Sequence, residues 1–141
     1  MKVAEFINTF MFASVYGRSG QCSKPTMETM QTTYSANFLL LPRIYCMDGF
    51  NISIQVNRGN YCASENGTRE FGLTWQEVEW GFPSEQIDGV KFNAEDEDNT
   101  MGTVGAFVPM NLIEGLVAEH GGLDLQTTLQ KEMENNVVVL D

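Results

Sequence analysis

Hydrophobic residues recur with a helical period near both ends of the chain. In residues 3–14 and again in residues 109–120, apolar side chains follow the i, i+3, i+4, i+7 spacing that gathers them on one face of a helix. These positions are Val3, Phe6, Ile7, Phe10 and Met11 in the first segment, and Leu112, Ile113, Leu116 and Val117 in the second. Pro109 suits the first turn of the second helix and Gly121 its C-terminal end. A helix is therefore expected over each segment.

Between these helices the period falls to two, which is typical of strands with one buried face. An apolar run from Phe38 ends at Pro42, and strands are expected at 43–46, at 50–56, from Tyr61, at 75–82 and at 103–108. Alternation is clearest in the second of these, where one face consists of Phe50, Ile52, Ile54 and Val56. The Asp48-Gly49 pair predicts the hairpin turn before it, because a tight turn needs positive φ.

The strand expected at 75–82 has two chemically different faces. Val78, Trp80 and Phe82 are predicted to face the core, and Glu77 and Glu79 the opposite side. In the last strand, alternation predicts a shared face for Val104, Ala106 and Val108.

The order of these elements predicts an α+β domain, with an antiparallel sheet of four to five strands flanked by N-terminal and C-terminal helices. Two further helices are expected, one over 25–34 after Ser23 and one over 125–134. We expect a single domain over 1–141. It divides into a helical N-terminal segment 1–37, an α+β core 38–123, and a C-terminal helix and tail 124–141. The apolar residues 137–140 are interpreted as an edge strand or a contact between protomers.

Charge is unevenly distributed along the chain. The net charge is −11, which argues against unaided binding to a nucleic-acid backbone. Residues 1–70 hold six basic and five acidic residues, whereas residues 71–141 hold two basic and 14 acidic residues. Such an acidic half either keeps the protein in solution or forms a face that binds a basic partner. For the second interpretation the candidate partner-binding residues are Glu77, Glu79, Glu95, Asp96, Glu97 and Asp98.

Nothing in the sequence predicts export or membrane insertion. No run of about 18 apolar residues is present, and the apolar stretch 3–13 is interrupted by polar residues. The three cysteines, Cys22, Cys46 and Cys62, form neither a C-x-x-C pair nor an even set for disulfides. We therefore expect a reduced, cytoplasmic protein.

Candidate catalytic residues are few. His120 is the single histidine, and its place in the last turn of the 109–120 helix favours a structural role there. The acidic run 96–102 lacks the glycine and glutamate positions of a calcium loop, and the Glu77–Glu79 pair lacks signs of a sugar cleft. We expect no enzymatic activity, no metal and no cofactor.

Ordered short motifs carry a resemblance to a known family. They are LPRIYCMDGFNIS (41–53), YC (61–62), VEWGFPSE (78–85), AED (94–96), TVGAFVP (103–109) and EHGG (119–122). In this order they resemble an uncharacterised family of small proteins encoded by phages and prophages, and the resemblance covers about 39–123. The family pattern places Pro-Arg after the Tyr-Cys pair, whereas this chain has Ala63-Ser64.

The resemblance implies a binding protein that acts in the host cytoplasm. The leading hypothesis is stoichiometric inhibition of a basic host defence protein, for example as an anti-CRISPR that imitates nucleic-acid charge. One alternative is a virion or assembly accessory that self-associates through 3–11 and 137–140. A weaker alternative is sequestration of a signalling nucleotide, for which Arg43, Arg58 and Arg69 are the cations placed among the strands.

Overall fold

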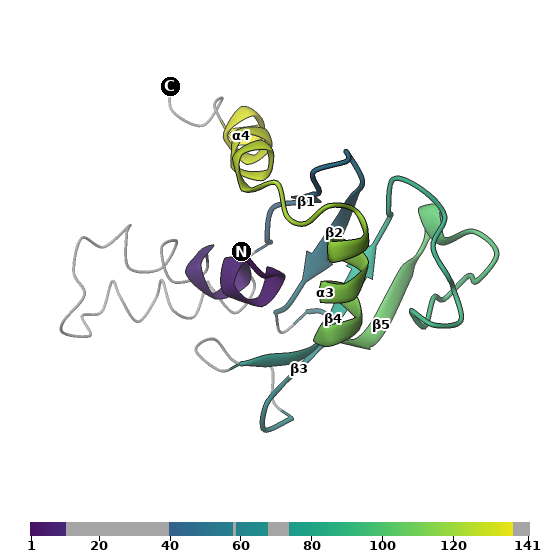
Figure 1. The fold of residues 1–141 in the computed structure, drawn as a ribbon. Coiled ribbons are helices and arrows are strands. Elements are labelled where there is room, and N and C mark those ends of the chain that lie inside the picture. Colours follow the sequence, from purple (N-terminus) through teal and green to yellow (C-terminus); the bar gives the residue numbers. More distant parts are fainter. Residues whose placement is uncertain (11–39, 58, 68–73, 137–141) are drawn as a thin grey trace.

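The computed structural model describes residues 1–10, 40–57, 59–67 and 74–136 (Figure 1). It confirms the α+β class, with a five-stranded antiparallel sheet and helices from both ends of the chain. A helix begins at residue 3 and continues through residue 10, the last residue described there. The other elements are β1 (Ile44–Tyr45), β2 (Asn51–Gln55), β3 (Ala63–Ser64), β4 (Trp75–Gly81), the 3₁₀ turn η1 (Thr100–Gly102), β5 (Val104–Pro109), α3 (Met110–Glu119) and α4 (Leu125–Asn136). The predicted helix 25–34 and the tail 137–140 lie outside the described residues.

The long strand β4 is the centre of the sheet. Trp80 pairs with Ile54 of β2 and with Gly105 of β5, so these two strands lie on opposite edges of β4. Glu77, further back along β4, pairs with Ala63 of β3 and with Pro109 of β5. β3 therefore continues the line of β2 along one edge, and residues 56–62 leave the sheet between them.

One face of this sheet is buried. Alternation in β2 is confirmed, because Ile52 and Ile54 are fully buried while the residues between them are partly exposed. The core joins the sheet to α3 and the N-terminal helix; its fully buried residues include Val3, Ile7, Ile44, Ile52, Ile54, Val78, Trp80, Val108 and Ile113. We call the opposite side, which carries Gln55, Glu77 and Glu79, the outer face.

A carboxylate fixes the N-terminal helix to α3. Oε1 of Glu114 accepts the main-chain N–H of Val3 at 2.6 Å, and its other oxygen accepts the N–H of Ala4 at 3.3 Å. These are first-turn N–H groups that have no acceptor inside their own helix, and a negative charge is favourable there. The apolar side of this helix is packed inside the chain, with Val3, Phe6 and Ile7 buried.

Two short segments pair with the outer edges of the sheet, one at β1 and one at β5. Asp124 donates its N–H to the carbonyl of Tyr45 in β1 at 2.8 Å. On the other side, Glu95 donates its N–H to the carbonyl of Val104 in β5 at 2.9 Å. Covered edges discourage pairing with a further strand.

Three details of the predicted strands are wrong. β4 ends at Gly81, so Phe82 does not face the core; its φ is +50° and its side chain is 52% exposed. The side chains of Val104, Ala106 and Val108 do not share one face of β5, because an extra residue opposite Glu79 shifts the register. Phe107 lies in this bulge with φ +49°. The third strand begins at Ala63, not at Tyr61, because residues 60–62 belong to the segment that leaves the sheet.

The C-terminal helices agree with the sequence. Pro109 is the N-cap of α3, and the chain leaves that helix through Gly121 and Gly122, both at φ near +90°. The stripe of α3 is buried, apart from a partly exposed Leu112. Among the described residues, no helix has both the length and the apolar character needed to cross a membrane.

Candidate functional site

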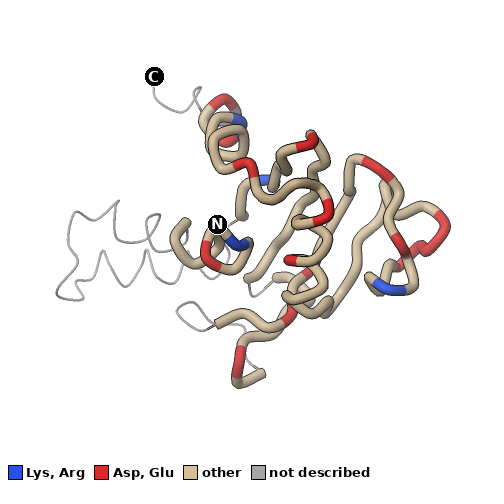
Figure 2. The backbone as a smooth tube through the Cα atoms, in the orientation of Figure 1, with Lys and Arg blue, Asp and Glu red and all other residues tan. Residues whose placement is uncertain are grey.

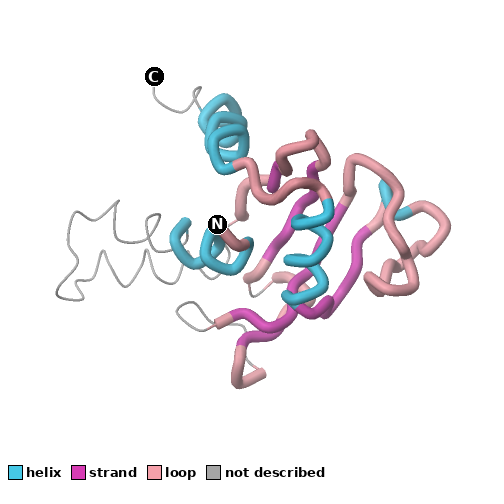
Figure 3. Tube along the Cα trace, in the orientation of Figure 1, coloured by secondary structure: helices cyan, strands magenta, loops and turns pink. Residues whose placement is uncertain are grey.

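Residues 82–103 form an acidic lobe at the β4–β5 end of the sheet (Figure 2). The lobe contains six acidic residues and one cation, Lys91. Apart from η1 it consists of loops and turns (Figure 3). Its conformation must therefore come from specific contacts.

The lobe is fixed to the sheet through a tryptophan. Trp80 is fully buried, and its indole N–H donates to the carbonyl of Phe92 at 2.7 Å. Phe92 and Ile87 bury their side chains in the same core. A loop with its own buried apolar residues and a satisfied indole is held in one position relative to the sheet.

Further contacts hold the acidic segment inside the lobe. Gly89 packs so closely on Glu97 that a Cβ at Gly89 would lie 2.5 Å from the Cα of Glu97. The side-chain amide of Gln86 donates to the carbonyl of Glu97 at 3.2 Å. The buried hydroxyl of Thr100 accepts the N–H of Ile87 at 2.9 Å. The main chain around Glu97 is thus fixed on two sides.

The acidic side chains of this segment point into solvent. Glu95, Asp96, Glu97 and Asp98 are all exposed, and none forms an ion pair with a described residue. Asp96 uses one oxygen to accept the N–H of Asp98 at 3.2 Å, which stabilises the turn. Three carboxylates, those of Glu95, Glu97 and Asp98, accept no hydrogen bond from a described residue.

The other two predicted partner-binding residues lie on the outer face, and one of them has a structural role. The carboxylate of Glu79 accepts the N–H of Tyr61 and the side-chain amide of Asn60, both at 2.9 Å. Glu77 is partly exposed and has no hydrogen bond or ion pair with a described residue. The six predicted residues therefore divide between the lobe and the outer face.

A pair of aromatic residues lies beside Glu79. The segment 56–62 crosses β4 there, because the carbonyl of Tyr61 accepts the N–H of Phe107 in β5 at 2.9 Å. The rings of Tyr61 and Phe107 lie 5.8 Å apart, and their side chains are 58% and 45% exposed. The exposure of Phe107 depends on the bulge in β5, which the sequence does not predict.

His120 joins three segments. Its Nδ1 lies 2.7 Å from a carboxylate oxygen of Asp48, its Nε2 lies 3.6 Å from Glu85, and its ring stacks on Phe50 at 4.0 Å. The N–H of Phe50 and the imidazole lower the pKa of Asp48. No thiol or hydroxyl of the described residues hydrogen-bonds to the imidazole; burial raises the pKa of the nearby Cys46 thiol to about 11. The arrangement lacks the activated nucleophile of a catalytic triad and holds the hairpin against the end of α3.

Of the three cations predicted to contact a nucleotide phosphate, Arg43 is hydrogen-bonded within the fold. Arg43 donates Nε to the side-chain oxygen of Asn51 at 2.6 Å and Nη2 to the carbonyl of Phe82. Burial lowers the pKa of its guanidinium. The other two candidates, Arg58 and Arg69, lie outside the described residues.

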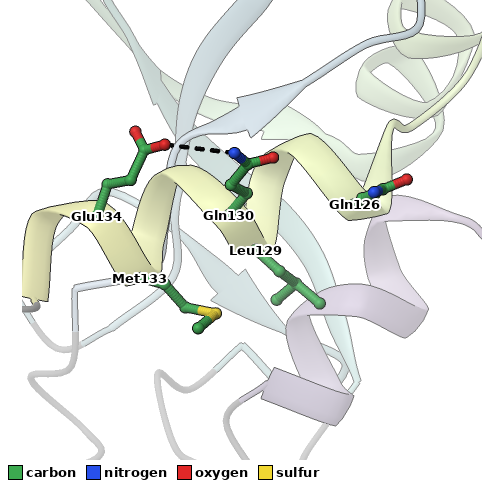
Figure 4. Close-up of a pocket in the computed structure, with 5 residues that line it drawn as sticks. All are labelled: Gln126, Leu129, Gln130, Met133 and Glu134. Carbon is green, nitrogen blue, oxygen red and sulfur yellow. Dashed lines mark hydrogen bonds between the residues drawn. The ribbon is translucent and has the colours of Figure 1, made fainter.

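A hollow beside α4 is apolar on one side (Figure 4). Leu129 and Met133 point to one side of the helix, while Gln130 donates to Glu134 at 3.4 Å on another. All its described lining residues come from this one helix, whereas small-molecule sites gather polar groups from several elements.

In the described part of the chain, no three histidine, cysteine or acidic side chains are arranged to hold a metal ion. The acidic lobe and the aromatic pair are therefore the two surfaces with distinctive chemistry. Compared with protein-family models, curated proteins and solved structures, the chain has no match.

Proposed function

We propose that this protein acts by binding, as a phage-encoded inhibitor that occupies the basic surface of a host defence protein. The target class is a nucleic-acid-binding effector, such as a CRISPR nuclease, in the host cytoplasm. The mode is stoichiometric occupation of a groove that otherwise binds a phosphate backbone.

The observation that supports this proposal is the rigid presentation of free carboxylates. Glu95, Glu97 and Asp98 extend from a main chain fixed through Gly89 and Trp80. A main chain that is already fixed loses little conformational freedom on binding, and complementary potential accelerates association with a basic surface. The phage resemblance of residues 39–123 supports a host target.

The test is a competition experiment with a purified host CRISPR effector and its labelled nucleic acid. The protein should displace the nucleic acid at about 0.1 M salt and lose this effect at about 1 M, where the Debye length shortens from about 10 Å to about 3 Å. The triple variant Glu95→Lys, Glu97→Lys, Asp98→Lys should weaken displacement at least tenfold.

A control variant separates position from total charge. Glu65, Glu119 and Glu134 are exposed acids outside the lobe. Reversing these three changes the net charge by the same amount, and displacement should fall less than threefold. Equal losses for both variants, or binding that does not change with salt, would contradict the proposal.

A further inference from the structure

The aromatic pair on the outer face has the features of a docking site. Phe107 has φ +49°, a left-handed conformation that is rare for a bulky side chain and that glycine adopts without strain. Its ring is 45% exposed, so burial does not compensate for this strain. Backbone strain of this kind concentrates at functional sites, which makes the exposed ring a candidate for a binding role.

The support beneath the pair is rigid. Phe107 donates its N–H to the carbonyl of Tyr61, and Tyr61 donates its own N–H to Glu79. The two rings lie 5.8 Å apart with planes inclined at 50°. Tyrosine and phenylalanine rings held in this way contribute contact area with little loss of side-chain freedom.

The surrounding charge is negative. The carboxylate of Glu79 accepts only neutral donors among the described residues, so its charge is not neutralised there. Glu77 projects to the same face about 7 Å away, two residues along the strand. Aromatic faces beside carboxylates are complementary to a cation that stacks and hydrogen-bonds at once.

We infer that the surface formed by Tyr61, Phe107, Glu77 and Glu79 binds an arginine side chain of the basic partner. Arginine fits better than lysine because its planar guanidinium stacks on an aromatic ring while its N–H groups pair with a carboxylate. This inference rests on the proposed function, since it assigns a second contact to the same partner. The lobe supplies attraction to positive charge, and the outer face supplies the preference for arginine.

The experiment compares nonapeptides of arginine and lysine as probes, with affinities measured by calorimetry at about 0.1 M salt. The protein should bind the arginine peptide at least tenfold more tightly than the lysine peptide. Phe107→Gly should reduce this ratio to below threefold while its thermal midpoint stays equal or rises, because glycine relieves the left-handed strain. Tyr61→Leu, which keeps apolar area but removes the aromatic face, should reduce the ratio in the same way.

Phe82 offers a matched control. It has φ +50° and a 52% exposed ring, as Phe107 does, but no described aromatic ring stacks with it. Phe82→Gly should therefore leave the arginine preference unchanged. A preference that survives in Phe107→Gly, or that is lost equally in Phe82→Gly, would overturn the inference.

Two further outcomes are distinguishable. If light scattering shows a dimer that Phe107→Gly dissociates, the surface binds a second copy and the inference is wrong. The lobe triple variant should weaken both peptides equally and keep their ratio. If that variant changes neither affinity, the lobe part of the proposed function fails, while the arginine preference remains as evidence for the outer-face site.

Discussion

Three exposed acids of the lobe and four carboxylates outside it are used in opposite ways, although Asp88 and Asp96 of the lobe also accept main-chain N–H groups. Outside the lobe, Asp48, Glu79, Glu114 and Asp124 each accept at least one main-chain N–H, so their charge stabilises turns and helix ends. Within the lobe, Glu95, Glu97 and Asp98 accept no hydrogen bond from a described residue and point into solvent. A net charge of −11 is therefore a poor measure of binding surface, because part of the charge is already used in the fold.

The largest expected effect comes from breaking the joint between the two regions. A Cβ at Gly105 would lie 2.1 Å from the indole nitrogen of Trp80. Gly105→Ala should displace the ring, break its bond to Phe92, and lower the free energy of unfolding by about 3 kcal/mol. Urea denaturation followed by tryptophan fluorescence measures this loss.

Gly115 provides the matched control for that substitution. It is an exposed residue of α3, and a Cβ there meets no atom within 4 Å. Gly115→Ala should raise the free energy of unfolding by up to about 1 kcal/mol. If the two variants have similar urea midpoints, the joint at Trp80 is not rigid.

The second prediction compares one carboxylate from each region. Glu79→Ala removes the acceptor of the Tyr61 N–H and of the Asn60 amide, and should cost about 1–2 kcal/mol of stability. Glu97→Ala removes a solvent-exposed side chain and should change stability by less than about 0.5 kcal/mol. Thermal denaturation of the two variants side by side checks this, and an equal loss would show that the two carboxylates contribute alike to stability.

The third prediction concerns acid. The N–H of Thr127, with its hydroxyl, lowers the pKa of Asp124, as Phe50 and His120 do for Asp48. A lowered folded-state pKa stabilises the protein above the unfolded value of about 3.9, and this contribution is lost as pH falls through the folded pKa. Asp124→Asn keeps a capping side chain but not the charge, so it should reduce the acid-induced fall in urea midpoint between about pH 6 and pH 2. An unchanged slope would contradict the assignment.

The smallest effect is a difference in thiol reactivity. With a pKa of about 11, about one Cys46 thiol in a thousand is ionised at pH 8, and the side chain is buried. A cysteine introduced by Asp98→Cys in the exposed lobe should react with iodoacetamide many times faster. Peptide mapping by mass spectrometry separates the two sites, and fast native labelling of Cys46 would show that the hairpin opens readily.

The sequence predicts elements well where the signal is local. The alternation of β2, the stripe of α3 and the Asp48-Gly49 turn all follow from residues within a few positions of one another. The outward position of Phe82 is not predictable in this way, because nothing in an aromatic side chain signals the left-handed conformation that turns it away from the core.

The candidate site was less predictable because its contacts are long-range. Glu79 and Tyr61 are 18 residues apart, and His120 and Asp48 are 72 apart. Spacing along the chain cannot distinguish a carboxylate that meets a distant N–H from one that remains free. The acidic run 95–98 is visible in the sequence because four consecutive charges require no tertiary partner to be recognised.

β2 and β3 follow one another along the same edge of β4, and this arrangement determines where the chain can change in length. Because both strands pair with the same edge of β4, residues 56–62 join two halves of one interrupted strand. Insertions or deletions there leave the pairing on either side in register, while they reshape the rim around Tyr61. Exchange of a few residues in this excursion thus alters the exposed surface and leaves the architecture untouched.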